Sequence, residues 1–538
     1  MVQDQDQFFD VGHRNRLAVF GVGKIDIGER TTFTVGASYD RFKPAVQSGL
    51  PGIAGGWDGS DGQLLDISRS TYLGADWNRF RSDIWSVFAD LTHRISERWT
   101  IRASGLYSDV ERVDIYSYIG NQPVTATNGV TNQIAYRGDS FMKTRSFDFN
   151  ALGTFPAFGR DQTLILGVDY QASSYQSYYT RLSNYAKIDV YDPVSPLEPP
   201  LNPYGPSAPT RCKAAPRTDS DAELRGIGHP DRAIWRLRPI ALQPDGRPHR
   251  DRRRASHLVG NDDAGAAACA RPERGYTVEG RFTPYAGLVW DVTGDWNVYG
   301  SYADSFTPQA APAGRSRPDG KDIEPLVGAQ YEVGTKLSLM DDRLLLSGAA
   351  YQIEQTNRLF NDPDDATVVL QVGKVRARGV EAEAAGEILP GWRINGGYSY
   401  TRTKYIEDAN AQYEGLPLVP IIPKHSIKLF TNYKQQSGSL AGLSLGGGLT
   451  WFSSTYGGVP AVRNAAGVVT TRSTIVRQGS YAVVDLRAGY EIDERISLSV
   501  NVNNLLDKSY YARISSTGRG NYYGTPRTVF ATLRFTYP

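Results

Sequence analysis

Apolar and hydrophilic side chains alternate one by one along much of this chain, and that period of two limits the fold to strands with two unlike faces. In TTFTVGASYD, one face holds Phe33, Val35, Ala37 and Tyr39, and the other holds Thr32, Thr34, Gly36 and Ser38. The same pattern recurs in WTIRASGLY (99–107), TLILGVDY (163–170), WRINGGYSY (392–400), RISLSVNVNN (495–504) and TVFATLRFTY (528–537). Each stretch predicts a strand of about ten residues with one apolar face, the length that crosses a bilayer as a tilted strand.

The lengths of the connections add a second constraint. Tight turns are predicted at 27–30, 95–98, 292–295, 339–342, 389–391 and 492–495. Long connections lie between them, near 43–81, 110–144, 305–329, 356–378, 404–424, 453–479 and 506–526. Short and long alternate, as they do in outer-membrane barrels, where the turns on one side are short and the loops on the other side are long. A soluble β-sandwich has no reason to alternate in this way.

These patterns predict an all-β protein, a large antiparallel transmembrane β-barrel of about 20–22 strands. About seventeen strands lie outside 205–275, and that region has room for two to four more. The 538 residues have a polar mean hydropathy of −0.40, with no apolar run long enough for a membrane-spanning helix. Composition alone leaves open a soluble multidomain protein or a barrel, and the loop alternation favours the barrel. Two cysteines are too few for a disulfide framework.

The last part of the chain, NVNNLLDKSYYARISSTGRGNYYGTPRTVFATLRFTY (501–537), carries a recognisable ending. Polar residues stop one strand, and glycine and proline set the return into the next. This segment resembles the closing segment of TonB-dependent outer-membrane receptors. The structural positions of that motif are Asn503, Asn504, Asp507, Tyr523, Gly524, Pro526 and Arg527. The alternative is an ordinary hairpin rich in glycine and tyrosine.

Four more segments resemble ferric-siderophore receptors of the hydroxamate and pyoverdine type: 64–83, 84–108, 276–309 and 325–339. The resemblance implies an outer-membrane location among lipid, capture of an Fe(III)–siderophore complex, and coupling to the TonB complex. Iron would arrive inside the siderophore, so the resemblance implies no protein cofactor and no metal ligands. No catalytic motif occurs, and an enzyme is not expected.

Candidate ligand residues lie on the first long connection. By the resemblance, aromatic faces at Tyr72 and Trp77 would contact the organic scaffold, and Arg79 would attract an anionic complex. The alternative is that Tyr72 and Trp77 pack the loop or belong to an interfacial girdle. Asp76, Asp362, Asp364 and Asp365 are interpreted as solvated loop residues.

The resemblance also raises expectations about the start of the chain. Receptors of this family carry a signal peptide, a TonB-contact box and an N-terminal plug domain, whereas FFDVGHRNRLAVFGVGKIDI (8–27) resembles the beginning of the barrel. We therefore expect the plug and box to be missing, and a truncated chain without energised uptake. The second hypothesis for such a chain is a passive porin-like channel.

One segment departs from the barrel composition. Residues 211–274 hold fourteen Lys/Arg against nine Asp/Glu, both cysteines and three of six histidines, and no tyrosine occurs between Tyr204 and Tyr276. DGRPHRDRRRASHL (245–258) in isolation resembles a nucleic-acid patch, but the strand pattern excludes that function for the whole chain. A one-base shift across 248–259 permits the alternating strand LTVIVGGRVTWW. A frameshifted segment is therefore one hypothesis and a basic insertion loop the other.

We divide the chain into 1–204 (first part of the barrel), 205–275 (anomalous segment) and 276–538 (closing part of the barrel).

Overall fold

The structure is a computed structural model. It describes residues 1–157, 160–201, 284–307, 309, 316–321, 323–361, 368–408, 413–464 and 466–536. The anomalous segment 205–275 and the frameshift hypothesis lie outside the described residues. The described chain is made of strands and loops without an α-helix. None of its described elements is a helix of the length and apolar character that would cross a membrane.

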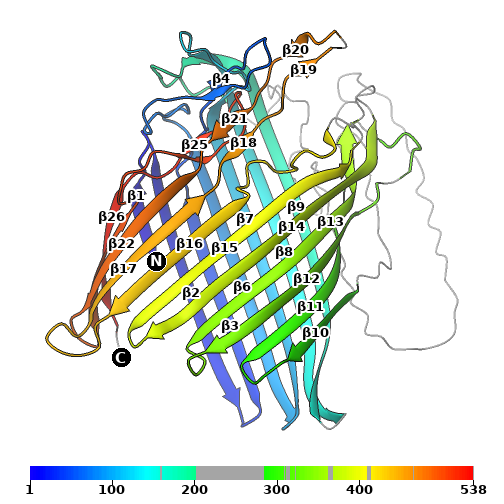
Figure 1. Ribbon diagram of the computed structural model, residues 1–538, viewed down its shortest axis with the longest axis vertical. Coiled ribbons are helices and arrows are strands. Elements are labelled where there is room, and N and C mark those ends of the chain that lie inside the picture. The colour runs from blue at the N-terminus through cyan, green and yellow to red at the C-terminus, as the bar shows by residue number, and fades with distance from the viewer. Residues whose placement is uncertain are drawn as a thin grey trace, which may run out of the picture. The chain divides into compact units, whose positions relative to one another are not determined.

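The first large sheet has seven strands, each antiparallel to its neighbour (Figure 1). Its strands, in order, are β1 (Val2–Asp6), β2 (His13–Ile27), β3 (Thr31–Lys43), β6 (Arg79–Ser96), β7 (Trp99–Ile119), β8 (Val130–Ala157) and β9 (Arg160–Asp189). The register is continuous over long stretches, for example from Trp99↔Gly153 to Ile119↔Gln133 between β7 and β8. These strands belong to one compact unit, made of residues 1–48, 70–120 and 129–275.

The second large sheet has eleven strands, and consecutive members again pair antiparallel. They are β10 (Tyr285–Asp291), β11 (Trp296–Thr307), β12 (Leu326–Leu339), β13 (Leu344–Asn361), β14 (Val369–Leu389), β15 (Trp392–Glu407), β16 (His425–Lys434), β17 (Leu443–Phe452), β22 (Tyr481–Glu491), β23 (Ile496–Asn503) and β26 (Thr528–Phe535). This sheet belongs to a second unit, made of residues 49–69, 121–128 and 276–538. The segments 49–69 and 121–128 therefore pack with the later part of the chain.

Short strand pairs organise the long loops of the second unit, at one end of its sheet (Figure 1). They are β4 (Gly52–Ile53) with β5 (Gln63–Leu64), β18 (Thr455–Gly457) with β21 (Val476–Gln478), β19 (Val462–Arg463) with β20 (Val469–Thr471), and β24 (Tyr511–Arg513) with β25 (Tyr522–Tyr523).

All six predicted tight turns are confirmed. Strands end and restart around 28–30, 97–98, 292–295, 340–343, 390–391 and 492–495. Several turns use a left-handed backbone, at Gly28, at Gly391 and at Met340 to Asp342. Most long connections also fall where they are predicted. The stretch 110–144 differs, because β7 continues to Ile119 and β8 starts at Val130, which leaves only 120–129 as the loop. The stretch 356–378 differs as well, because β13 continues to Asn361 and β14 starts at Val369.

Each sheet has one apolar and one polar face. In the second sheet, exposed side chains form an apolar row across β16, β17, β22, β23 and β26: Leu429, Leu449, Leu486, Val500 and Leu533. In the first sheet the predicted apolar face of β3 continues onto β6, since Val35 is opposite Ala89 and Ala37 is opposite the exposed Val87. Contiguous exposed apolar rows on strands of this length are typical of surfaces that face lipid.

Buried apolar side chains gather under the long loops instead of between the strands. In the first unit, Ile115, Ala135 and Leu201 form a small core against which Trp77 packs. In the second unit, Leu50, Leu65, Val476 and Ile514 are nearly inaccessible, and all four lie in loops or in short loop strands. The loops are therefore packed bodies and not loose connections.

Candidate functional site

The three predicted ligand residues lie in the first unit, where β6 begins. Tyr72 is buried, its ring stacks on Phe9 with centroids 5.9 Å apart, and its hydroxyl donates to the Ala75 carbonyl at 3.3 Å. Burial raises the pKa of Tyr72 above its ordinary value, so the phenol stays neutral. Both the ring and the hydroxyl of Tyr72 are therefore engaged within the protein.

Trp77 and Arg79 are brought together by the segment that follows β9. The Trp77 indole donates to the Pro196 carbonyl at 2.9 Å, and Arg79 forms an ion pair with Glu198 at 2.8 Å. Arg79 also donates to the Trp77 carbonyl at 3.0 Å. These contacts agree with the loop-packing alternative for Trp77. A ligand role for the three residues stays a prediction.

The C-terminal motif holds the last long loop in place through Asn504. Strand β23 ends at Asn503, and Asn504 adopts a left-handed backbone with φ of 51°. Its buried side chain donates to the carbonyls of Lys508 and Thr525, both at 3.0 Å, and accepts from the Lys508 amide at 2.8 Å. The Asn504 side chain thus joins the beginning of the loop, at Lys508, to its end, at Thr525. It can do so because an asparagine amide both donates and accepts hydrogen bonds.

The same motif also attaches the first long loop to the last one. Asp507 accepts two hydrogen bonds from the guanidinium of Arg69, at 3.0 and 2.9 Å. The hydroxyls of Tyr511 and Tyr523 both donate to the Leu65 carbonyl, at 2.7 and 2.9 Å. We call this set of contacts between 65–69 and 507–523 the loop clamp. The motif residues Tyr523 and Asp507 thereby receive structural roles.

Two further motif positions support the clamp from the strand side. The Arg527 amide donates to Asp507 at 2.9 Å, next to Pro526. Gly524 lies against the Tyr510 ring so closely that an added Cβ would be 2.1 Å from a ring carbon. The Arg69 guanidinium, with help from the Arg527 amide, lowers the pKa of Asp507 to about 2. The Asp507 carboxylate of the clamp is therefore ionised across the physiological pH range.

A row of aromatic rings on the first sheet was missed at the sequence level. Rings from β6, β7, β8 and β9 contact one another in turn, and we call them the aromatic ladder: Phe80, Tyr116, Tyr118, Tyr136 and Tyr179. Successive centroids are 5.1 to 6.0 Å apart, and Tyr136 and Tyr179 are stacked within 13° of parallel. The Arg112 guanidinium lies 5.6 Å from the centre of the Phe80 ring.

The ladder lies on the polar face of its sheet, close to the long-loop end. Arg102 and Tyr116 both lie on β7 and are separated by an even number of residues. The Tyr116 ring therefore lies on the same face of the sheet as the charged Arg102 side chain. Tyr116 is directly opposite Tyr136, and the glycine at 138 leaves room for the Tyr136 ring. The pairing that aligns the rings forms within 110–144, where the sequence predicts a loop. The alternation of side-chain types continues through DIYSYI (114–119), and this was the sequence signal that could have predicted a strand there.

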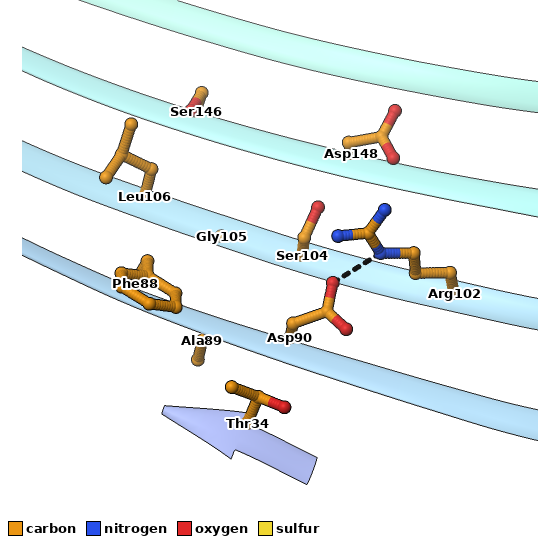
Figure 2. A pocket seen from close by; sticks show the side chains of 10 residues that line it. All are labelled: Thr34, Phe88, Ala89, Asp90, Arg102, Ser104, Gly105, Leu106, Ser146 and Asp148. Carbon is orange, nitrogen blue, oxygen red and sulfur yellow. Dashed lines mark hydrogen bonds and ion pairs between the residues drawn. The ribbon is translucent and has the colours of Figure 1, made fainter. Parts of the chain in front are cut away.

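A shallow hollow lies lower on the same face. Figure 2 shows Asp90 and Arg102 bonded across it, with Phe88 and Leu106 at one side and Asp148 at the other. The hollow has a volume of about 480 Å³ and is completed by Thr34, Ala89, Ser104, Gly105 and Ser146. Phe88 fits against Gly36, where a Cβ would be 2.5 Å from the ring. Among the described residues of both units, no three His, Cys, Asp or Glu side chains are grouped to hold a metal ion.

Comparison with known proteins identifies the family. Residues 45–505 match the family model described as "TonB dependent receptor-like, beta-barrel". The chain belongs to the TonB-dependent receptor family. Members of this family are outer-membrane β-barrel proteins, and the exposed apolar rows agree with that location.

Similar proteins include several siderophore receptors. The ferric-pyoverdine M114 receptor PbuA of Pseudomonas sp. M114 is 30% identical over 537 residues, covering 99% of this chain and 62% of the receptor. The ferripyoverdine receptor of Pseudomonas aeruginosa PAO1 is 28% identical over 556 residues, covering 99% of this chain and 61% of that protein. This TonB-dependent receptor chain thus spans about three fifths of the length of those relatives.

A solved structure supports the same grouping. The pyoverdine outer-membrane receptor FpvA of Pseudomonas aeruginosa PAO1, bound to pyoverdine, aligns with a TM-score of 0.73 at 25% identity. The alignment covers 100% of this chain and 73% of that structure. The predicted family and its strand-rich barrel fold are confirmed.

Proposed function

We propose that this TonB-dependent receptor captures a ferric siderophore of the pyoverdine type at the outer surface of the outer membrane. The observation that carries the proposal is the similarity to ferric-pyoverdine receptors along almost the whole chain. We further propose a closed barrel of about 20–22 strands, passage of the iron complex through it, and the TonB complex as the partner that supplies energy.

The aromatic ladder is the proposed capture surface. Ring faces stack on the organic scaffold of a siderophore, and a guanidinium attracts an anionic iron complex. Tyr179 is 47% exposed at one end of the ladder, and Arg112 lies at the other. Arg79, which precedes Phe80 on β6, lies on the opposite face of that strand from the ladder, so its ligand role stays a separate proposal.

Binding of ferric pyoverdine to the refolded chain in detergent tests this proposal. We expect saturable quenching of tryptophan fluorescence, and weakening of about tenfold for Tyr136→Ala, because that change removes the central stacking face. Tyr331→Ala is the matched control, since Tyr331 is an exposed tyrosine on β12 outside the ladder. Equal affinity of the two variants would contradict the ladder assignment. Absence of any binding by folded protein would contradict the function.

The shallow hollow around Asp90 and Arg102 also supports the second candidate, a passive channel. Charged and hydroxyl side chains line it at mid-strand, as in the water-filled lumen of porins. Conductance in planar bilayers separates the two functions. A porin-like channel would conduct small ions at a level that ferric pyoverdine leaves unchanged, whereas capture within the lumen reduces the current.

A further inference from the structure

One asparagine side chain continues the pairing between β6 and β7 past the point where their backbones separate. The last backbone pair of the two strands is Arg79↔Ile115. One residue before Arg79, the Asn78 amide bonds the main chain of Ser117. Its oxygen accepts from the Ser117 N–H at 2.7 Å, and its nitrogen donates to the Ser117 carbonyl at 3.1 Å. An asparagine amide has the donor and acceptor of a peptide group, so it replaces the residue that a longer β6 would supply.

The main chain of Ser117 depends on this contact. In an antiparallel sheet, the N–H and C=O of one residue point to the same neighbouring strand, and those of the next residue point to the other. Because both groups of Ser117 point to Asn78, the main-chain groups of Tyr116 and Tyr118 point to β8. Ser117 is fully buried, so water cannot replace the amide. Loss of the Asn78 amide would therefore leave two buried polar groups without these bonds, which is costly.

The two residues beside Ser117 carry rings of the aromatic ladder. Tyr116 and Tyr118 lie on the face opposite to the Ser117 side chain, with ring centroids 5.3 Å apart. The Tyr116 ring also contacts Phe80 and Tyr136, at centroid distances of 5.1 and 5.2 Å. A shift of the main chain at Ser117 would move both tyrosine rings and change the contacts along the ladder.

The loop before β6 holds the Asn78 amide in its turn. The Asn78 N–H donates to the Ala75 carbonyl at 3.0 Å, and the Tyr72 hydroxyl donates to the same carbonyl at 3.3 Å. Gly74 lies so close that an added Cβ would be 2.4 Å from the Tyr72 hydroxyl oxygen and 2.5 Å from Asn78 Nδ2. The Asn78 side chain is therefore packed on the loop side and bonded on the strand side.

We propose that Asn78 is the positioning residue of the aromatic ladder. Its two hydrogen bonds fix the main chain at Ser117, and this fixes the angle at which Tyr116 and Tyr118 present their ring faces. Rings that are already aligned lose less freedom when a ligand stacks on them, which raises the affinity. Asn78 acts through Ser117 and needs no contact with the ligand. The effect on affinity rests on the proposed capture of a ferric siderophore by the ladder, whereas the effect on the rings does not.

The variant Asn78→Asp tests this role through its pH dependence. The ionised carboxylate still accepts from the Ser117 N–H but cannot donate to the Ser117 carbonyl, whereas the protonated carboxyl does both, as the amide does. The facing carbonyl oxygen favours the protonated form and raises the pKa of the introduced carboxyl above the ordinary value of about 4. Relative to the unchanged protein at the same pH, we expect affinity for ferric pyoverdine about tenfold lower near pH 7 and recovered toward about pH 4. A general disturbance of packing by the new side chain would not be reversed by acid.

A second measurement follows the rings without any ligand. A fluorine-labelled tyrosine at position 118 alone reports on that ring by fluorine NMR of the full chain, refolded in detergent. Its resonance should move in Asn78→Asp near neutral pH and return to that of the unchanged protein in acid. It should stay moved at both pH values in Asn78→Ala and in Gly74→Ala, whose new methyl group displaces the Asn78 amide. Asn395→Asp is the matched control, since Asn395 is an exposed asparagine of the second unit, and it should change neither the resonance nor the affinity.

The two measurements separate this inference from the proposed function. An unmoved fluorine resonance in folded Asn78→Ala overturns the inference. So does unchanged affinity of Asn78→Asp near neutral pH when Tyr136→Ala weakens binding, because the ladder then binds without help from Asn78. If Tyr136→Ala also leaves affinity unchanged, the proposed capture surface is wrong, and the fluorine resonance still decides whether Asn78 orients the rings. If Asn78→Ala does not show the heat-modifiable gel migration of a folded barrel, Asn78→Asp decides alone, and a resonance shift that acid fails to reverse overturns the inference.

Discussion

Arg69 and Asp507, 438 residues apart in the chain, face each other through two parallel N–H···O bonds of 3.0 and 2.9 Å. We expect Arg69→Gln to loosen the loop clamp, because glutamine cannot reproduce the two-pronged contact. The measurement is hydrogen exchange at the Arg527 amide, which donates to the same carboxylate. Its exchange should become faster in Arg69→Gln and stay unchanged in Arg79→Gln, which breaks the ion pair with Glu198 instead. Unchanged exchange in both would contradict the clamp.

Acid should open the clamp only at very low pH. The pKa of Asp507 is lowered to about 2 in the folded protein, below the value of about 4 for an unfolded aspartate. A lowered pKa means that the ion pair adds stability above about pH 4 and loses it as the pH falls toward 2. Exchange of the Arg527 amide, corrected for its intrinsic pH dependence, should therefore rise between about pH 4 and pH 2. A rise centred at or above pH 5 would show that another group controls the loop.

The two tyrosines of the clamp share one acceptor, and their effects should therefore depend on each other. Either Tyr511→Phe or Tyr523→Phe leaves the Leu65 carbonyl with one donor, whereas the double variant leaves it buried with none from the described residues. A typical hydrogen bond contributes about 1 kcal/mol, and an unsatisfied buried group costs about 1–3 kcal/mol. The double variant should thus lower the free energy of unfolding by more than the sum of the single changes. Strict additivity in a double-mutant cycle would argue against the shared acceptor.

Gly524 should tolerate no side chain. Its backbone angles are ordinary, but an added Cβ would be 2.1 Å from the Tyr510 ring, so Gly524→Ala must displace that ring. We expect a loss of stability of about 1–3 kcal/mol, as for overpacked interiors. Gly21→Ala on β2 is the control, since nothing lies within 4 Å of a Cβ at that position. Thermal unfolding, followed by heat-modifiable migration, compares the two variants.

The sequence predicts the strands and short turns well because both depend on neighbouring residues. Alternation assigned the face of Val35, and glycine or aspartate marked the turns at 28 and at 341. Asn503 and Asn504 were correctly placed at a strand end. These features need no knowledge of distant partners.

What the sequence could not predict depends on contacts between segments far apart. The aromatic ladder requires the pairing of Tyr116 with Tyr136 inside a stretch whose composition suggested a loop. The roles of Leu65 and Arg69 appear only once residues near 511 and 523 are placed beside them. The role of Asn78 likewise depends on the pairing of β6 with β7, because no local pattern brings its amide to the main chain of Ser117.

The loop clamp has a consequence for the order in which the protein is made. Residues 65–69 leave the ribosome long before the tyrosines and the aspartate that hold them, which follow 438 to 458 residues later in the chain. Contacts of such long sequence separation form late and slowly. A nascent or shortened chain would therefore expose an unmatched Arg69 and an unmatched Leu65 carbonyl. A correctly closed first loop would in turn mark a receptor whose synthesis has passed residue 523.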